Sequence, residues 1–356
     1  MAYTTIDDPS AYFQVATYTG DNNDDRQVTN DGNSDLKPDW VWLKDRTQAQ
    51  SHALFDSTRG ATKRLQSNTT GAESTETSTL KSFTTDGFTL GTSSTINNGT
   101  NPDEYVAWQW KANGGTTVSN TDGDLTSTVQ FNSTAGFSIV TYTGKDPIEP
   151  LQVGHGMGEA PDVFIIKNRS GSRLWAVYHK DLTSPAANRY LILNTSTYGE
   201  LANSTLWGNV APSSTIISTG ENAGVNQPNE NFVAYCWKER QGYSKFGKYV
   251  GNGDANGSFV YTGFKPAMII LRRIDAANNW LIYDHKRSGY NPKQDKLYPD
   301  DASAEDASTT SVDLLSNGFK LRASSASQNA SGGTYIYMAF AENPFTTSTG
   351  IPTTAR

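Results

Sequence analysis

The sequence has a single cysteine, Cys236, and only four methionines among its 356 residues. One cysteine cannot form a disulfide within its own chain. No apolar run approaches the ~20 residues of a membrane span, and residues 1–10 lack the apolar core of a signal peptide. These absences predict a protein without membrane insertion that is made and kept in a cytoplasm, or that leaves it by cell lysis.

Acidic residues outnumber basic ones, 36 to 29, so the formal net charge is −7. A nucleic-acid partner usually needs a basic stripe, so the charge argues against one. Helix-forming runs of Leu, Glu, Lys and Ala are nearly absent, whereas Thr, Ser, Asn and the 31 glycines are abundant. Strands separated by polar turns are therefore expected throughout, and the fold class is predicted as all-β.

One sequence pattern, typical of a short buried strand, occurs three times. The copies are 105–111 (YVAWQWK), 232–238 (FVAYCWK) and 335–341 (YIYMAFA). Strand side chains alternate between faces, so each copy has one face of large apolar groups and one of smaller groups. The large faces are Val106/Trp108/Trp110, Val233/Tyr235/Trp237 and Ile336/Met338/Phe340. We expect each large face to fill a sandwich core, with Trp110, Trp237 and Phe340 buried at equivalent positions. Cys236 falls on a small face and is interpreted as a small hydrophobe.

Two more motifs recur in the same order. The second is PDWVWLK at 38–44, PDVFIIK at 161–167 and PAMIILR at 266–272. The third opens each copy, at 18–20, 142–144 and 249–251. The period is longer than the roughly 20–50 residues of solenoid and propeller repeats and close to a domain of roughly 100 residues.

The repeat predicts three tandem antiparallel β-sandwich domains of the jelly-roll or concanavalin-like kind. We expect them in line, as an elongated molecule in which the first domain swings on a linker. The predicted parts are an N-terminal attachment arm at 1–12, a linker at 116–135, a C-terminal tail at 347–356, and sandwiches at 13–115, 136–241 and 242–346.

The sequence motifs predict no catalytic residue, cofactor or metal ligand. The histidines His52, His155, His179 and His285 are not spaced as a metal pair. Asp39 and Asp162 occupy equivalent motif positions, but Ala267 replaces them in the third copy. A glycosidase-like carboxylate pair and a calcium ion at Asp21–Asp25 are the alternatives.

Aromatic residues in loop-like stretches are the remaining candidates for a site. Tyr198, Trp207 and Tyr290 lie among Ser, Asn and Gly. Rings beside polar amides suit glycan binding, because sugars offer apolar faces and many hydroxyls. The alternative is that these rings cover loops or fill contacts between subunits.

Longer stretches carry a resemblance to a known family. They are residues 1–6 (MAYTTI), 37–44 (KPDWVWLK), 105–115 (YVAWQWKANGG), 242–247 (GYSKFG) and 332–345. In these the chain resembles virion structural proteins of tailed phages infecting marine bacteria. The resemblance implies a non-enzymatic tail fibre or tail-associated host-recognition protein at the virion surface. A head decoration or capsid-fibre protein is the alternative, and a polysaccharide-degrading tailspike is the second alternative.

Assembly follows as an expectation. Virion surface proteins work as symmetric oligomers, and exposed apolar faces on small sandwiches need covering. We expect a homo-oligomer, with a trimer favoured, that contacts other virion proteins through residues 1–12. A host-surface glycan is the expected ligand.

Overall fold

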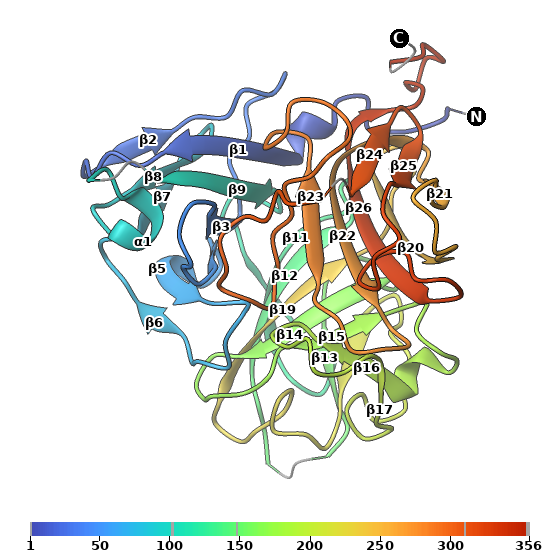
Figure 1. Ribbon diagram of the computed structural model, residues 1–356. Helices are drawn as coiled ribbons and strands as arrows, with labels where there is room; N and C mark the ends of the chain where they lie inside the picture. Colours follow the sequence, from blue (N-terminus) through green and yellow to red (C-terminus); the bar gives the residue numbers. More distant parts are fainter. Residues whose placement is uncertain (1, 101–102, 147–148, 310, 354–356) are drawn as a thin grey trace.

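The computed structural model describes all residues except 1, 101–102, 147–148, 310 and 354–356. The described chain is nearly all β, in several open sheets whose named strands pair antiparallel (Figure 1). Its three helices are single turns, namely η1 (Pro9–Ala11), α1 (Ser94–Asn97) and η2 (Ala186–Asn188). The all-β prediction is therefore confirmed.

The first unit has a six-stranded and a three-stranded sheet. The larger one runs in the order β1 (Phe13–Thr19), β9 (Glu104–Trp110), β3 (Trp40–Asp45), β4 (Ala53–Asp56), β5 (Gly60–Leu65) and β6 (Ser74–Thr75). The smaller one contains β2 (Arg26–Val28), β8 (Phe88–Leu90) and β7 (Leu80–Phe83).

The second unit has an eight-stranded and a two-stranded sheet. The larger one contains, in order, β10 (Val118–Asn120), β11 (Ser127–Asn132), β12 (Phe137–Thr143), β19 (Asn231–Trp237), β14 (Val163–Asn168), β15 (Ala176–His179), β16 (Arg189–Ile192) and β17 (Leu201–Ala202). The smaller one pairs β13 (Leu151–Gly154) with β18 (Ile216–Thr219). Residues 116–135, expected as a linker, supply β10 and β11 to this sheet.

The third unit has a four-stranded and a three-stranded sheet. The larger one contains β20 (Ser244–Val250), β26 (Thr334–Pro344), β22 (Phe264–Arg273) and β23 (Leu281–Asp284). The smaller one contains β21 (Phe259–Tyr261), β25 (Gly318–Leu321) and β24 (Val312–Leu315).

The strand registers make the three units equivalent. Trp40 lies opposite Trp110, Val163 opposite Trp237, and Met268 opposite Phe340. The repeated strands β9, β19 and β26 each lie between the strand that carries the third motif and the strand that carries the second. Trp110, Trp237 and Phe340 are 1%, 2% and 1% exposed. Their predicted burial at equivalent positions is confirmed.

The large apolar faces of the three repeated strands meet in one shared core. Trp40 stacks on Tyr235 of the second unit with ring centroids 4.4 Å apart. Trp110 meets Phe340 of the third unit edge-on at 5.5 Å. The expected elongated, in-line arrangement with a swinging first domain is therefore wrong. Large rings bury the most apolar area, and here each unit buries them against its neighbours.

The smaller faces pack against the small sheet of the same unit and form a core within each unit, which we call its private core. In the first unit, Ala107 and Val41 of the large sheet belong to one cluster with Val28 and Phe88 of the small sheet. The second and third units repeat this arrangement. Cys236 lies in the second private core and is fully buried. Both faces of each repeated strand are thus covered, and the expected assignment of the large faces to separate sandwich cores is corrected.

Contacts between the units run around a ring. The equivalent residues are those that precede or begin β4, β15 and β23, and each bonds to a backbone carbonyl of the preceding unit. His52 Nε2 lies 2.9 Å from the Tyr298 carbonyl, Trp175 Nε1 donates to Gln66 at 3.0 Å, and Trp280 Nε1 donates to Ile192 at 2.9 Å. The first unit thus bonds to the third, the second to the first, and the third to the second. The molecule is a pseudo-threefold ring within one chain.

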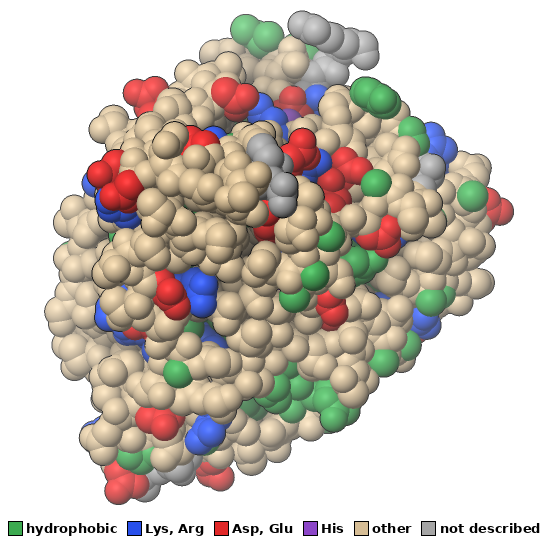
Figure 2. Space-filling model, turned by 60° about the vertical axis from the view of Figure 1, so that its left-hand side comes forward, with side chains coloured by type: hydrophobic (Ala, Val, Ile, Leu, Met, Phe, Trp, Pro, Cys, Tyr) green, Lys and Arg blue, Asp and Glu red, His purple; other side chains and the backbone are tan. Residues whose placement is uncertain are grey.

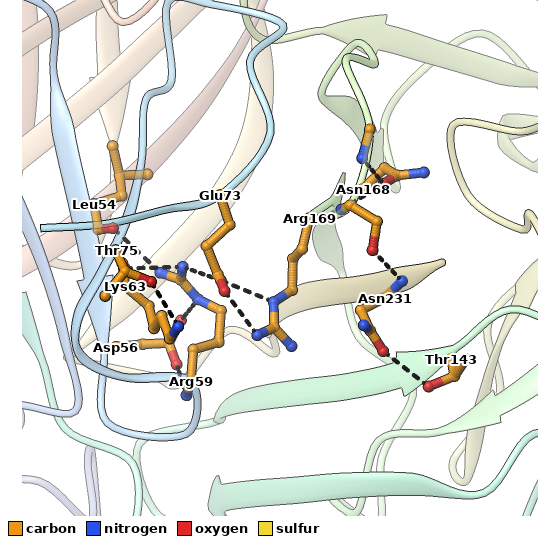
Figure 3. Close-up of polar contacts among 12 residues, drawn as sticks. Leu54, Asp56, Arg59, Lys63, Glu73, Thr75, Thr143, Asn168, Arg169 and Asn231 are labelled. Atoms are coloured by element: carbon orange, nitrogen blue, oxygen red, sulfur yellow. Dashed lines mark hydrogen bonds and ion pairs between the residues drawn. The ribbon is translucent and has the colours of Figure 1, made fainter. Parts of the chain in front are cut away.

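A buried ionic network strengthens the seam between the first and second units (Figure 3). Asp56 pairs with Arg59, both side chains being fully buried, and accepts the Tyr235 hydroxyl of the second unit at 2.7 Å. Arg59 also donates to Glu73 at 2.9 Å. Arg169 of the second unit reaches the same carboxylate at 2.8 Å. Every charge in the network therefore has an opposite partner.

The seam between the third and first units repeats this network. Asp284 pairs with Arg287 at 2.6 Å and accepts Trp108 Nε1 of the first unit at 3.0 Å. Arg287 reaches Glu305 at 2.8 Å, and Arg46 of the first unit reaches Glu305 at 2.8 Å.

The seam between the second and third units has lost the buried ion pair and both arginines together. At the equivalent positions it has His179, Leu182, Met338 and Ile274. His179 Nε2 instead lies 3.3 Å from the Tyr337 carbonyl, and Leu182 and Met338 belong to the shared apolar core. Loss of one partner alone would leave a buried charge uncompensated. The concerted replacement avoids that cost.

We predict that Arg59→Leu alone destabilises the fold by about 3–5 kcal/mol, since it leaves Asp56 buried without its cation. The triple variant Asp56→His, Arg59→Leu, Tyr235→Met copies three of the four equivalent positions of the seam between the second and third units and leaves Arg169 paired with Glu73. It should recover most of that loss in urea unfolding. A triple variant no more stable than Arg59→Leu would show that the seams are not interchangeable.

The pH dependence of stability provides a second prediction. Burial lowers the pKa of His52 and of His179 from 6.5 to about 3. The unfolded chain therefore takes up these protons first, and the stabilisation from the neutral rings, complete above pH 6.5, is lost as the pH falls toward 3. Each ring should contribute about 2–3 kcal/mol of destabilisation between pH 7 and pH 4.5. Urea unfolding of His52→Gln and His179→Gln should show a correspondingly smaller difference between the two pH values than the parent chain shows. An unchanged difference would contradict the assignment.

The N-terminal arm lies against the third unit of its own chain. Thr4 Oγ1 donates to the Gln241 carbonyl at 2.7 Å, and the Tyr3 hydroxyl donates to Gly263 at 2.5 Å. Ile6 is 2% exposed and belongs to the shared core. Asp7 binds Ser348 of the C-terminal tail at 2.6 Å, and both chain ends lie at one corner (Figure 1). Because residues 2–12 contribute to the fold, their removal would expose core surface.

Candidate functional site

The three units differ most clearly just beyond the repeated strand. In the first unit, Asp39 accepts the Ser57 hydroxyl at 2.7 Å and the Ala112 backbone N–H at 2.7 Å. Burial raises the pKa of Asp39, against the effect of these hydrogen bonds. In the second unit, Asp162 accepts the Glu239 N–H at 2.9 Å. Each carboxylate holds the chain where it leaves its repeated strand.

The third unit has Ala267 at this position, so it lacks the carboxylate. The strand pair instead continues, with Phe264 opposite Pro344 and a register irregularity on either side of Pro266. Glu342 stands where the first unit has Ala112, and His285 stands where it has Ser57. The space that Asp39 occupies in the first unit lies beside a hollow in the third.

Three neighbouring hollows surround Glu342, and we call them together the Glu342 groove. The first, about 220 Å³, lies between β1 of the first unit and the third unit, and Phe13, Ala267 and His285 line it. The second, about 270 Å³, is lined by Lys265, His285, Tyr290 and Lys293. The third, about 690 Å³, reaches Asn317 and Thr353. Because Glu342 lines all three, the hollows adjoin one another around this side chain.

Charged groups in the groove are partly paired. Lys265 Nζ lies 2.9 Å from both carboxylate oxygens of Glu342. Only Oε1 accepts a hydrogen bond from it, and the buried Oε2 has no hydrogen-bond partner among the described residues. Lys286 pairs with Asp31 of the first unit at 2.6 Å. Burial lowers the pKa of His285 and of Lys293. The groove therefore combines a neutral imidazole, ammonium groups and the two carboxylates of Glu342 and Asp31, which suits binding of a polar ligand.

The three aromatic residues singled out in the sequence lie in different places. Tyr290 is 83% exposed and lines the second hollow of the groove. Tyr198 is 49% exposed at the seam between the second and third units, where its carbonyl accepts a hydrogen bond from Arg272. The predicted glycan contact at Trp207 is corrected, because Trp207 is 1% exposed and packs edge-on against Phe164 at 4.8 Å. Its polar neighbours in the sequence hid a core residue.

Other candidate residues have structural partners. His155 is buried, and its Nε2 lies 3.1 Å from the Ser213 carbonyl. In the acidic stretch Asp21–Asp25, Asp21 pairs with Arg26, whereas Asp24 and Asp25 pair with Lys81. Among the described residues, no three His, Cys, Asp or Glu side chains are grouped to hold a metal ion. No helix in the described part of the chain is long and apolar enough to cross a membrane.

Sequence reasoning did not identify the Glu342 groove as a site. The signal was present, since Ala267 breaks the repeated Pro-Asp motif and Glu342 follows the third repeated strand. What the sequence does not show is that β1 and Asp31 of the first unit form the opposite wall.

Residues 8–344 match the family described as a domain of unknown function (DUF7483), and the chain belongs to that family. The match covers all three units, so the family is defined by the whole ring. No curated protein and no solved structure matches the chain.

Proposed function

We propose that this chain is a non-enzymatic structural protein of a phage particle, a tail fibre or tail-associated protein that binds host-surface glycans. The observation that carries the glycan role is the Glu342 groove, where a polar hollow adjoins the exposed ring of Tyr290. The resemblance of residues 1–6, 37–44 and 332–345 to phage virion proteins supports the location at the virion surface.

The architecture proposed for each unit is a small β-sandwich domain, of the jelly-roll or concanavalin-like kind. Three such domains in one ring supply, within a single chain, the threefold arrangement that a homotrimer of one-domain subunits would have. The apolar faces that called for a trimer are covered inside the chain. A homotrimer of whole chains is therefore a weaker expectation than the sequence suggested.

Head decoration is the second candidate, and the ring shape favours it. Three units packed around a shared core make a compact body, whereas a fibre is elongated. On the face shown in Figure 2, acidic and basic side chains lie in small mixed groups, without a continuous basic stripe. Attachment would use the corner where residues 2–12 and the C-terminal tail meet.

Adsorption inhibition tests the recognition role. Host cells incubated with the recombinant chain should adsorb at least tenfold fewer phage, because the soluble protein occupies their surface glycans. Tyr290→Ala should lose the inhibition, and Tyr198→Ala, which removes an exposed tyrosine outside the groove, should retain it.

Cryo-electron microscopy of the particle, together with the adsorption assay and a polysaccharide-cleavage assay, distinguishes host recognition from head decoration and from a tailspike enzyme. Full adsorption in the presence of the protein, with many copies on the head, would establish decoration in place of recognition. Shortening of host polysaccharide by the purified chain would instead indicate a tailspike enzyme.

A further inference from the structure

We infer that the Glu342 groove takes an acidic oligosaccharide, with the anionic group of one sugar held at the second hollow beside Lys293. This inference rests on the proposed glycan-binding function and names the chemical class of the ligand. It starts from a contrast of charge. The chain carries a net charge of −7, yet the second hollow is lined by two ammonium groups, those of Lys265 and Lys293, against a single carboxylate, Glu342, with the neutral imidazole of His285 beside them.

Lys293 is the residue that calls for an anion. It is 4% exposed, and its ammonium group donates to the backbone carbonyls of His285 and Ser288. An ammonium has three donors, so one N–H remains for the hollow among the described contacts. None of the described ion pairs gives Lys293 a carboxylate partner within 4.0 Å. The carboxylates of Asp284, Glu342 and Asp295 favour its charge only from a distance. Burying a cation that has no carboxylate in direct contact is costly, and a ligand carboxylate at this position would supply that contact.

Neighbouring groups in the groove would contact the uncharged parts of the oligosaccharide. Lys265 already neutralises Glu342, so that carboxylate does not repel an anion as a free one would. Tyr290 offers an exposed ring on which the apolar face of a sugar can stack. Asn317 and Asn343 line the third hollow with amides that suit hydroxyl groups.

The shape of the groove favours a chain of sugars over a single anion. The three hollows follow one another past Glu342, from Asp31 of the first unit to Asn317 and Thr353. A free phosphate or carboxylate would fill only the second hollow. A nucleic acid would also bring anionic groups, but it needs several cations in a row, and Lys265 and Lys286 are already paired.

Isothermal titration of the full chain with matched oligosaccharides tests the inference. The probes are hexamers of galacturonate, glucuronate, mannuronate and N-acetylneuraminate, each beside its methyl ester, which has the same length and no charge. At least one acid should bind at least tenfold more tightly than its ester, and the difference should shrink as salt rises from 50 to 500 mM.

Three variants locate the site. Ala267→Asp introduces the side chain that the first two units carry and fills the first hollow with a carboxylate, so binding of the acid should fall at least tenfold. Lys293→Met should abolish the preference for acid over ester. Tyr198→Ala is the control and should bind as the parent chain does. Thermal unfolding of each variant checks that the fold is kept.

The outcomes distinguish this inference from the function on which it rests. Equal binding of acid and ester overturns the acidic class and leaves glycan recognition standing. Acid binding that survives Ala267→Asp in the folded protein overturns the groove as its location. If none of the hexamers binds at millimolar concentration, the inference fails, and the adsorption experiment with Tyr290→Ala then decides the proposed function separately.

Discussion

The rest of the structure depends on the burial of three large apolar faces against one another. A unit of roughly 100 residues has little core of its own, and the small sheets cover only one face of each large sheet. The opposite faces, with Trp108, Tyr235 and Met338 at their centres, have no cover except the neighbouring units. The ring closes because three such faces bury one another completely. No unit would be stable with that surface exposed to water.

The seams show how a closed ring tolerates divergence among its parts. The rings at the His52, Trp175 and Trp280 positions keep their bond to the preceding unit in all three seams. The buried ion pair varies, being present in two seams and replaced as a set in the third. Directional bonds at the seam therefore fix how the units are placed, while apolar packing supplies most of the free energy. An isolated Asp or Arg at the third seam would be a buried charge without its partner and would destabilise the fold.

Much of the fold could be predicted from the sequence, because short-range patterns determine it. Alternation in 105–111, 232–238 and 335–341 identified the repeated strands and the residues that share a face. It could not say which face meets which partner, since that depends on contacts between residues far apart in the sequence. Trp207 shows the same limit, because a polar sequence neighbourhood says nothing about the sheet that lies beneath a loop. The groove lies between the first unit and the third. A local pattern could mark Ala267 and Glu342, but it could not show that β1 and Asp31 form the opposite wall.

The position of the groove follows from the same repetition. In the first two units a buried aspartate binds the chain just past the repeated strand, and loss of such a cap leaves a backbone donor unsatisfied. In the third unit β22 and β26 stay paired past this point, as far as Phe264 opposite Pro344, and Glu342 falls at the register irregularity between Lys265 and Pro266. Lys265 and Glu342 pair with each other here, and His285 Nδ1 lies 3.1 Å from the Ala267 carbonyl. The groove that these side chains line therefore lies where the last unit meets the first.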